Sequence, residues 1–291
     1  MDVVERALYN GFLSGVALSG NRFFYVNPLE SNGKEPFNRG SNERFGWTDC
    51  PCCPTNVVRF LPTVPGLGYA TAADGLYVNL FIDGSVKTHI GKTAVKVGQK
   101  TRYPWDGRVK LSIEPASPAT FTVNIRIPGW ARNQPVPGGL YRYDDAEQPI
   151  VKLAVNGQPV SVEPVKGYAS IRRQWRKGDI ITLDLPMPVR RVVANPAVKA
   201  DAGRFAVERG PLVYCAEGAD NDGKVLGKVP GAAVSFEIVT KPDMLGGIEV
   251  IKMTPIEKGD TLTLIPYYAW CHRGQNEMAI WFQSFSPQPL P

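Results

Sequence analysis

Most of this sequence is a succession of short runs in which apolar and polar side chains alternate, separated by breaks that contain glycine or proline. Residues 86–90, 93–97 and 121–127 show the alternation clearly, and it places every second side chain on one face of a strand. Asn156-Gly157, between two such runs, is typical of a tight hairpin turn. Strands at this spacing, in a chain with 29 Gly and 26 Pro among 291 residues, favour β-sandwich domains.

The alternating runs define the strands that the sequence predicts. We expect strands at 76–82, 86–90, 93–97, 109–113, 121–127, 151–155, 168–171, 180–185, 190–193, 204–215, 234–239, 248–253, 261–265 and 278–282. Pro186-Met187-Pro188 interrupts the series and marks a candidate domain boundary. A chain of this length is expected to form two domains, with room for a partial third.

The N-terminal part has a different pattern, which predicts an amphipathic helix over 2–17. Its apolar stripe consists of Val4, Leu8, Tyr9, Phe12 and Leu13. A short aromatic strand at 22–29, a polar loop at 30–49 and a helix at 54–62 are expected to follow. A lone amphipathic helix needs a surface to pack on. A chain that opens in mid-helix and then becomes all-β therefore suggests part of a longer protein.

The charge pattern and the hydropathy pattern exclude two classes of partner. The net charge of +6 is modest, and the Lys and Arg residues are scattered rather than gathered in a stripe with aromatic residues between them. We therefore expect no binding of nucleic acid. No apolar run approaches the roughly 18 residues that a membrane-spanning helix needs, so no membrane segment is expected.

Three thiols lie within four residues, at Cys50, Cys52 and Cys53, just before the predicted second helix. Thiolates are preferred zinc ligands, and an activated thiolate is also a strong nucleophile. Three other interpretations stay open: buried small apolar residues, disulfides, or a redox pair, although the spacing is C-x-C-C. Because tetrahedral zinc takes four ligands, part of any zinc shell must come from elsewhere.

Few other residues stand out as candidates for chemistry. His89 lies on an alternating strand and is expected at the surface or packed in the core. Cys271 and His272 either lend a ligand to the thiols or pack near a turn, and Cys215 is expected in the core. The carboxylates near the thiols in sequence have no spacing that singles one out as an acid: Glu30, Glu35, Glu43 and Asp49.

Several segments together resemble glycoside hydrolase family 127, the β-L-arabinofuranosidases, and the related family 146. They are residues 5–10, 23–29, 52–56, 75–81, 127–130, 208–214 and 265–270. They run in the family's order across nearly the whole chain, and the Cys-Cys-Pro-x-Asn motif at 52–56 is the most specific of them.

The resemblance implies an (α/α)6 barrel followed by two β-sandwich domains. The expected fold class is mostly β, with two β-sandwich domains preceded by the last helices of a truncated barrel. The expected parts are a barrel remnant with the thiol loop at 1–70, a first sandwich at 71–185, a second sandwich at 186–262, and terminal strands at 263–291 that return to the first sandwich.

The resemblance also implies a mechanism. Cys52 would be the nucleophile of a retaining hydrolase, Cys53 a ligand of the zinc cofactor, and Tyr25 a residue on the substrate side. Sulfur would attack the anomeric carbon, form a thioglycosyl enzyme, and be released by water. The implied substrates are glycans or oligosaccharides that contain L-arabinofuranose.

In the family, the acid/base Glu, further zinc ligands and most of the barrel lie upstream of the matched segments. We therefore expect this chain to hold an incomplete zinc site, to need the missing N-terminal barrel region as its partner, and to have little activity alone. The alternative is a non-catalytic, carbohydrate-binding or structural β-sandwich protein whose cysteines are merely buried.

Overall fold

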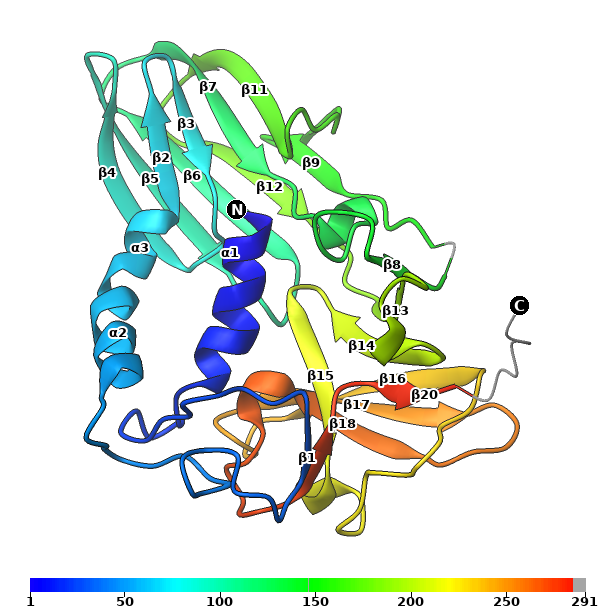
Figure 1. Ribbon diagram of the computed structural model, residues 1–291. Coiled ribbons are helices and arrows are strands. Elements are labelled where there is room, and N and C mark those ends of the chain that lie inside the picture. The colour runs from blue at the N-terminus through cyan, green and yellow to red at the C-terminus, as the bar shows by residue number, and fades with distance from the viewer. Residues whose placement is uncertain (146, 285–291) are drawn as a thin grey trace. The chain divides into compact units, whose positions relative to one another are not determined.

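The computed structural model describes residues 1–145 and 147–284, and strands dominate it, with short helices near the N-terminus (Figure 1). This confirms the expected mostly-β fold class. The chain forms two compact units. The first comprises residues 1–2, 59–134 and 147–188, and the second comprises residues 3–58, 135–146 and 189–291.

The first unit contains a six-stranded sheet in the order β10-β9-β12-β6-β5-β4 and a four-stranded sheet in the order β11-β7-β3-β2. Their bounds are β2 (Tyr69–Ala72), β3 (Gly75–Val78), β4 (Gly84–Ile90), β5 (Thr93–Thr101), β6 (Arg108–Pro115), β7 (Ala119–Arg126), β9 (Lys152–Val155), β10 (Gln158–Val160), β11 (Tyr168–Trp175) and β12 (Asp179–Asp184). Buried residues alternate along β6, as the sequence predicts for a strand with one face in a core. Leu111 of one sheet and Val123 of the other are fully buried.

The second unit is built on a ten-stranded sheet whose main path is β16-β17-β18-β15-β14-β13-β8. Its strands are β1 (Glu30–Asn32), β8 (Tyr141–Tyr143), β13 (Val189–Ala194), β14 (Arg204–Arg209), β15 (Leu212–Glu217), β16 (Val234–Lys241), β17 (Ile248–Pro255), β18 (Leu262–Pro266), β19 (Glu277–Ala279) and β20 (Phe282–Gln283). The N-terminal strand β1 lies antiparallel to β19 near the other end of the chain (Figure 1).

The predicted first helix is present, over residues 2–14 rather than 2–17, and docks through polar groups. It starts as α1 (Asp2–Arg6) and continues as a π-helical segment (Ala7–Phe12). The Asn10 side chain donates to the carbonyl of Pro211 at 2.9 Å and accepts from the amide of Val213 at 2.8 Å. Of the predicted apolar stripe only Leu8 is buried, and the other four side chains are partly exposed.

The second predicted helix begins two residues earlier than expected, as α2 (Cys52–Phe60), and continues through a 3-10 turn (Leu61–Thr63) into α3 (Val64–Leu67). None of the described helices has the length and apolarity that crossing a bilayer requires.

Two predictions for the N-terminal part are wrong. Residues 22–29 are not a strand, because their backbone bonds go to loop segments: Phe24 donates to the carbonyl of Gly15, and Tyr25 donates to the side chain of Asn38. The predicted loop at 30–49 contains the short strand β1.

The predicted return of residues 263–291 to the first sandwich is also wrong for the described residues. Strand β18 pairs with β15 and β17, β19 pairs with β15, and β20 pairs with β14, all within the second unit. The reason is burial, since Leu264 and Ile265 have no exposed surface in that core. Residues 285–291 lie outside the described residues, and the boundaries at 1–70, 71–185 and 186–262 stay predictions.

Candidate active site

The start of α2 fixes the position of the thiols. Thr55 donates its amide and its hydroxyl to the carbonyl of Pro51, at 3.1 and 2.8 Å. Asn56 donates its side-chain amide to the carbonyl of Cys52 at 2.8 Å. The residues that follow the thiols in sequence therefore close the first turn and hold Cys52 at the helix N-terminus, where the helix dipole favours negative charge.

The three thiols lie together without forming a disulfide. The sulfur atoms of Cys52 and Cys53 are 3.7 Å apart, and those of Cys50 and Cys52 are 4.0 Å apart. A disulfide would need about 2.05 Å, and all three cysteines are free, with Cys50 and Cys52 exposed. The interpretations as disulfides and as buried apolar residues are therefore wrong for Cys50 and Cys52.

Tyr25, distant in sequence, lies beside the same sulfur. Its hydroxyl oxygen is 4.0 Å from Cys52 Sγ, and its amide donates to Asn38 Oδ1 at 2.7 Å. The Arg39 guanidinium lies over the tyrosine ring, 5.0 Å from its centroid, and forms an ion pair of 3.4 Å with Asp49. Sequence reasoning missed Arg39, because only the path of the loop brings it to Tyr25.

The thiols differ in how readily they ionise. Hydrogen bonds from Cys53 and then Tyr25 lower the pKa of Cys52, because they stabilise its thiolate. Burial, followed by the adjacent Cys52, raises the pKa of Cys53. The hydrogen bond with Cys52 raises the pKa of Tyr25. Of this pair of adjacent thiols, Cys52 is the one that ionises more readily.

The sulfur spacing fits part of a zinc site. Zinc–sulfur bonds of about 2.3 Å at tetrahedral angles place two sulfur ligands about 3.8 Å apart, close to the 3.7 Å between Cys52 and Cys53. Across residues 1–145 and 147–284, no group of three or more His, Cys, Asp or Glu side chains is arranged to hold a metal ion. The described residues therefore hold no complete metal site, and the sulfur spacing is compatible with two ligands at most.

A buried cation supports the backbone next to Tyr25. The Arg44 guanidinium donates to the carbonyls of Ser14, Trp270 and Cys271 at 2.8 to 3.1 Å. It also lies 4.1 Å from the ring centroid of Phe24, which stacks on Trp270. Burial lowers the pKa of Arg44 to about 10.

Cys271 and His272 have partners of their own rather than a contact with the thiols. Cys271 is buried, and its sulfur donates to the carbonyl of Asn42 at 3.5 Å. His272 accepts from the amide of Leu18 at 3.0 Å. Cys215 is buried in the core, as predicted.

Three family models together match almost the whole chain. The β-L-arabinofuranosidase GH127 catalytic domain matches residues 1–66, the corresponding middle domain matches 75–187, and the glycoside hydrolase family 127 C-terminal domain matches 189–283. The chain belongs to glycoside hydrolase family 127. The resemblance to this family that the sequence segments showed is therefore confirmed.

Individual relatives agree with the family assignment. The non-reducing end β-L-arabinofuranosidase of Bifidobacterium longum subsp. longum is 34% identical over 96% of this chain and 44% of its own length. A solved GH127 β-arabinofuranosidase is 44% identical, with a TM-score of 0.90 over 97% of this chain and 45% of its own. A solved GH127 β-L-arabinofuranosidase from Geobacillus stearothermophilus T6 is 37% identical, with a TM-score of 0.85 over 97% of this chain and 46% of its own. The chain thus spans less than half the length of these family 127 relatives.

Proposed function

We propose that this chain carries the nucleophile of a retaining β-L-arabinofuranosidase, and that the nucleophile is Cys52. The observation that supports this most is the setting of its sulfur: exposed, at the start of a nine-residue helix, and within hydrogen-bonding reach of Cys53 and Tyr25. These contacts lower the pKa of the Cys52 thiol. The substrates would be glycans that contain L-arabinofuranose, as the names of the family 127 relatives suggest.

The proposed reaction has two displacements at one carbon. The Cys52 thiolate attacks the anomeric carbon, a carbon–sulfur bond forms, and the glycosidic carbon–oxygen bond breaks. The departing oxygen takes a proton from an acid, which in the family lies upstream of the matched segments. Water then attacks the same carbon, gives a proton to the base that the acid became in the first step, and releases the thiolate, so two inversions give net retention. Tyr25, beside the sulfur, would contact the sugar.

Zinc is the proposed cofactor, with Cys53 as one of its ligands. A zinc ion bound there would keep the neighbouring thiols deprotonated near neutral pH. The remaining ligands would come from the upstream part of the family fold. We accordingly propose that residues 1–291 by themselves hydrolyse glycosides slowly or not at all.

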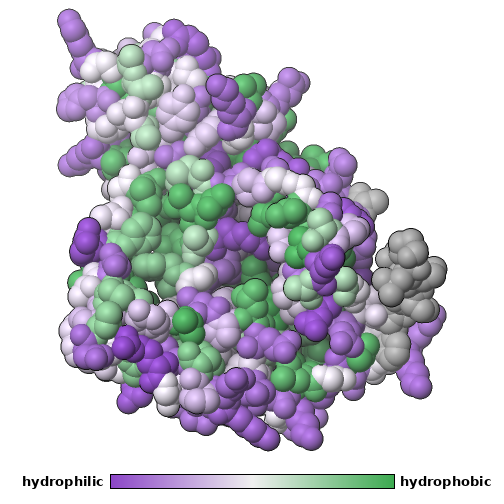
Figure 2. All heavy atoms as spheres, viewed as in Figure 1, coloured by the Kyte–Doolittle hydropathy of each residue, from purple (hydrophilic) through white to green (hydrophobic). Residues whose placement is uncertain are grey.

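The N-terminal helices provide the surface on which an upstream barrel region would pack. Val3 of α1 and Val58 of α2 are 63% and 66% exposed. Hydrophobic side chains gather over α1 and α2 on the visible face (Figure 2). Exposed apolar patches of this kind mark sites of protein–protein contact.

An activated substrate tests the nucleophile without the acid, because 4-nitrophenolate leaves without being protonated. We expect the protein in excess zinc to release about one equivalent of 4-nitrophenol from 4-nitrophenyl β-L-arabinofuranoside in a burst, the sign of a covalent intermediate. Cys52→Ser should abolish the burst. Cys50→Ser, which removes a second exposed thiol two residues away, should retain it. A burst that survives in Cys52→Ser would refute the proposal.

A further inference from the structure

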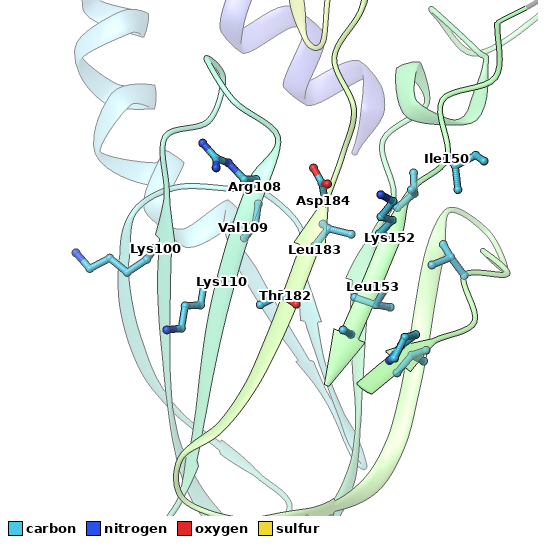
Figure 3. A pocket seen from close by; sticks show the side chains of 15 residues that line it. Lys100, Arg108, Val109, Lys110, Ile150, Lys152, Leu153, Thr182, Leu183 and Asp184 are labelled. Carbon is cyan, nitrogen blue, oxygen red and sulfur yellow. The ribbon is translucent and has the colours of Figure 1, made fainter. Parts of the chain in front are cut away.

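A pocket of about 790 Å³ lies on the six-stranded sheet of the first unit, within the size range of small-ligand sites. It is lined by β5, β6, β9, β10, β12 and the segments beside β9 and β10. The side chains that line it come from adjacent strands (Figure 3). The charged lining residues are Lys100, Arg108, Lys110, Lys152 and Asp184. Four cations around one carboxylate make it a basic pocket.

The strand register brings these charges together in two rows. Lys100 lies directly opposite Lys110 on β5 and β6. In the neighbouring row, Asp184 of β12 lies between Arg108 of β6 and Lys152 of β9 (Figure 3). Like charges directly opposite each other destabilise a sheet. The placement of Lys110 opposite Lys100 therefore does not stabilise this sheet, which favours a role for Lys110 in binding an anion.

Two of the cations have no acidic partner. Lys100 forms an ion pair with Asp83 at 3.0 Å, and Arg108 forms one with Asp106 at 2.8 Å. Lys110 and Lys152 have no carboxylate oxygen within 4.0 Å among the described residues. The pocket thus presents two ammonium groups that are available to an anionic ligand.

The remaining lining suits a sugar ring. Ala154, Pro159 and Val160 provide an aliphatic surface, and the Thr182 hydroxyl and Asp184 carboxylate can bond sugar hydroxyls. We propose that this pocket binds an acidic glycan, with uronate carboxylates on Lys110 and Lys152 and sugar hydroxyls on Asp184 and Thr182. The choice of a glycan over other anions rests on the proposed function.

Titration with oligogalacturonate, a chain of linked uronates, tests whether the pocket binds an acidic glycan. Its methyl ester serves as the uncharged control ligand. Calorimetry on the full chain should detect binding of the free acid and much weaker binding of its methyl ester, which has the same sugar backbone but no charge. The double variant Lys110→Gln/Lys152→Gln should bind about tenfold more weakly, since two exposed ion pairs are lost.

The control variant Lys87→Gln/Lys177→Gln removes two exposed lysines of the same unit that do not line the pocket, and it should bind like the wild type. Equal binding of acid and ester would overturn the proposal, as would an equal loss in the control variant. Tighter, lysine-dependent binding of a single-stranded oligonucleotide would also overturn it. Cys52→Ser should bind normally, so failure of the thiol chemistry and failure of the pocket are distinguishable.

Discussion

His272 joins two segments of the second unit through a neutral ring. Its Nε2 accepts from the amide of Leu18 at 3.0 Å, so Nδ1 carries the proton and donates to the carbonyl of Ala269 at 2.9 Å. Burial, followed by the nearby Arg44 cation, lowers the pKa of His272 to about 4. A proton added to Nε2 would replace the acceptor for Leu18 with a donor.

This pKa predicts a pH dependence of stability. Because the folded value lies below the ordinary value of 6.5, the unfolded chain binds more protons between these two values. The folded state should therefore lose stability as the pH falls from 6.5 towards 4, and His272→Gln should lose less than the wild type. Urea unfolding across this range is the measurement. His89→Gln, which changes an exposed ring, should behave like the wild type; equal slopes in all three proteins would contradict the prediction.

At the scale of single residues, the sequence could predict contacts between neighbours along the chain. Cys52 and Cys53 are adjacent, so their proximity follows from the chain itself. Tyr25 entered only through the family resemblance, and the structure brings it to Cys52. Arg39 could not be predicted, because its approach to Tyr25 depends on the loop and on a left-handed backbone at Arg39, with φ of 52°.

Among the elements, the hairpin between β9 and β10 shows the clearest link from sequence to structure. Asn156 and Gly157 have φ values of 51° and 79°, the left-handed pair that a two-residue turn requires. The Asn156 side chain also accepts from the amide of Ile180 at 2.8 Å and donates to Asp179. The turn therefore ties β9 and β10 to β12.

Gly157→Ala should destabilise the first unit by about 1 kcal/mol, because Ala tolerates positive φ poorly. No atom lies within 4 Å of the added methyl group, so the cost is conformational rather than steric. Gly66→Ala in α3 adds a methyl group to equally open space at an ordinary φ and should be neutral or stabilising. Denaturant unfolding gives the change in the free energy of unfolding for both variants. Equal changes in the two variants would contradict the prediction.

Regular elements with a buried alternating face were the predictable part of the fold. Strands β4 to β7 and β12 lie where the alternation places them. The segment at 22–29 has the same aromatic character, but Tyr25 donates to the Asn38 side chain instead of to a strand. The short strands β1, β2, β8 and β10 have too few residues to show a period, and their pairing depends on tertiary contacts.

At the scale of the whole molecule, residues from both ends of the chain build one unit. Strand β1 pairs with β19, and the first helix reaches β15 through Asn10. Sequence patterns could not predict this pairing, because register between distant strands is set by burial in the assembled core. The thiols at 50–53 thus belong to the same unit as the C-terminal strands. The family 127 relatives are about twice as long as this chain.

The most direct test of the whole account is to locate the sugar on the protein. The protein would be incubated with excess zinc and 4-nitrophenyl β-L-arabinofuranoside, quenched with acid and digested, and the peptides would be sequenced by mass spectrometry. We predict a single pentosyl group on the sulfur of Cys52, absent from Cys52→Ser and still present in Cys50→Ser. A pentosyl group on Cys50 or Cys53 instead, or an unmodified Cys52 after 4-nitrophenol has been released, would contradict the account.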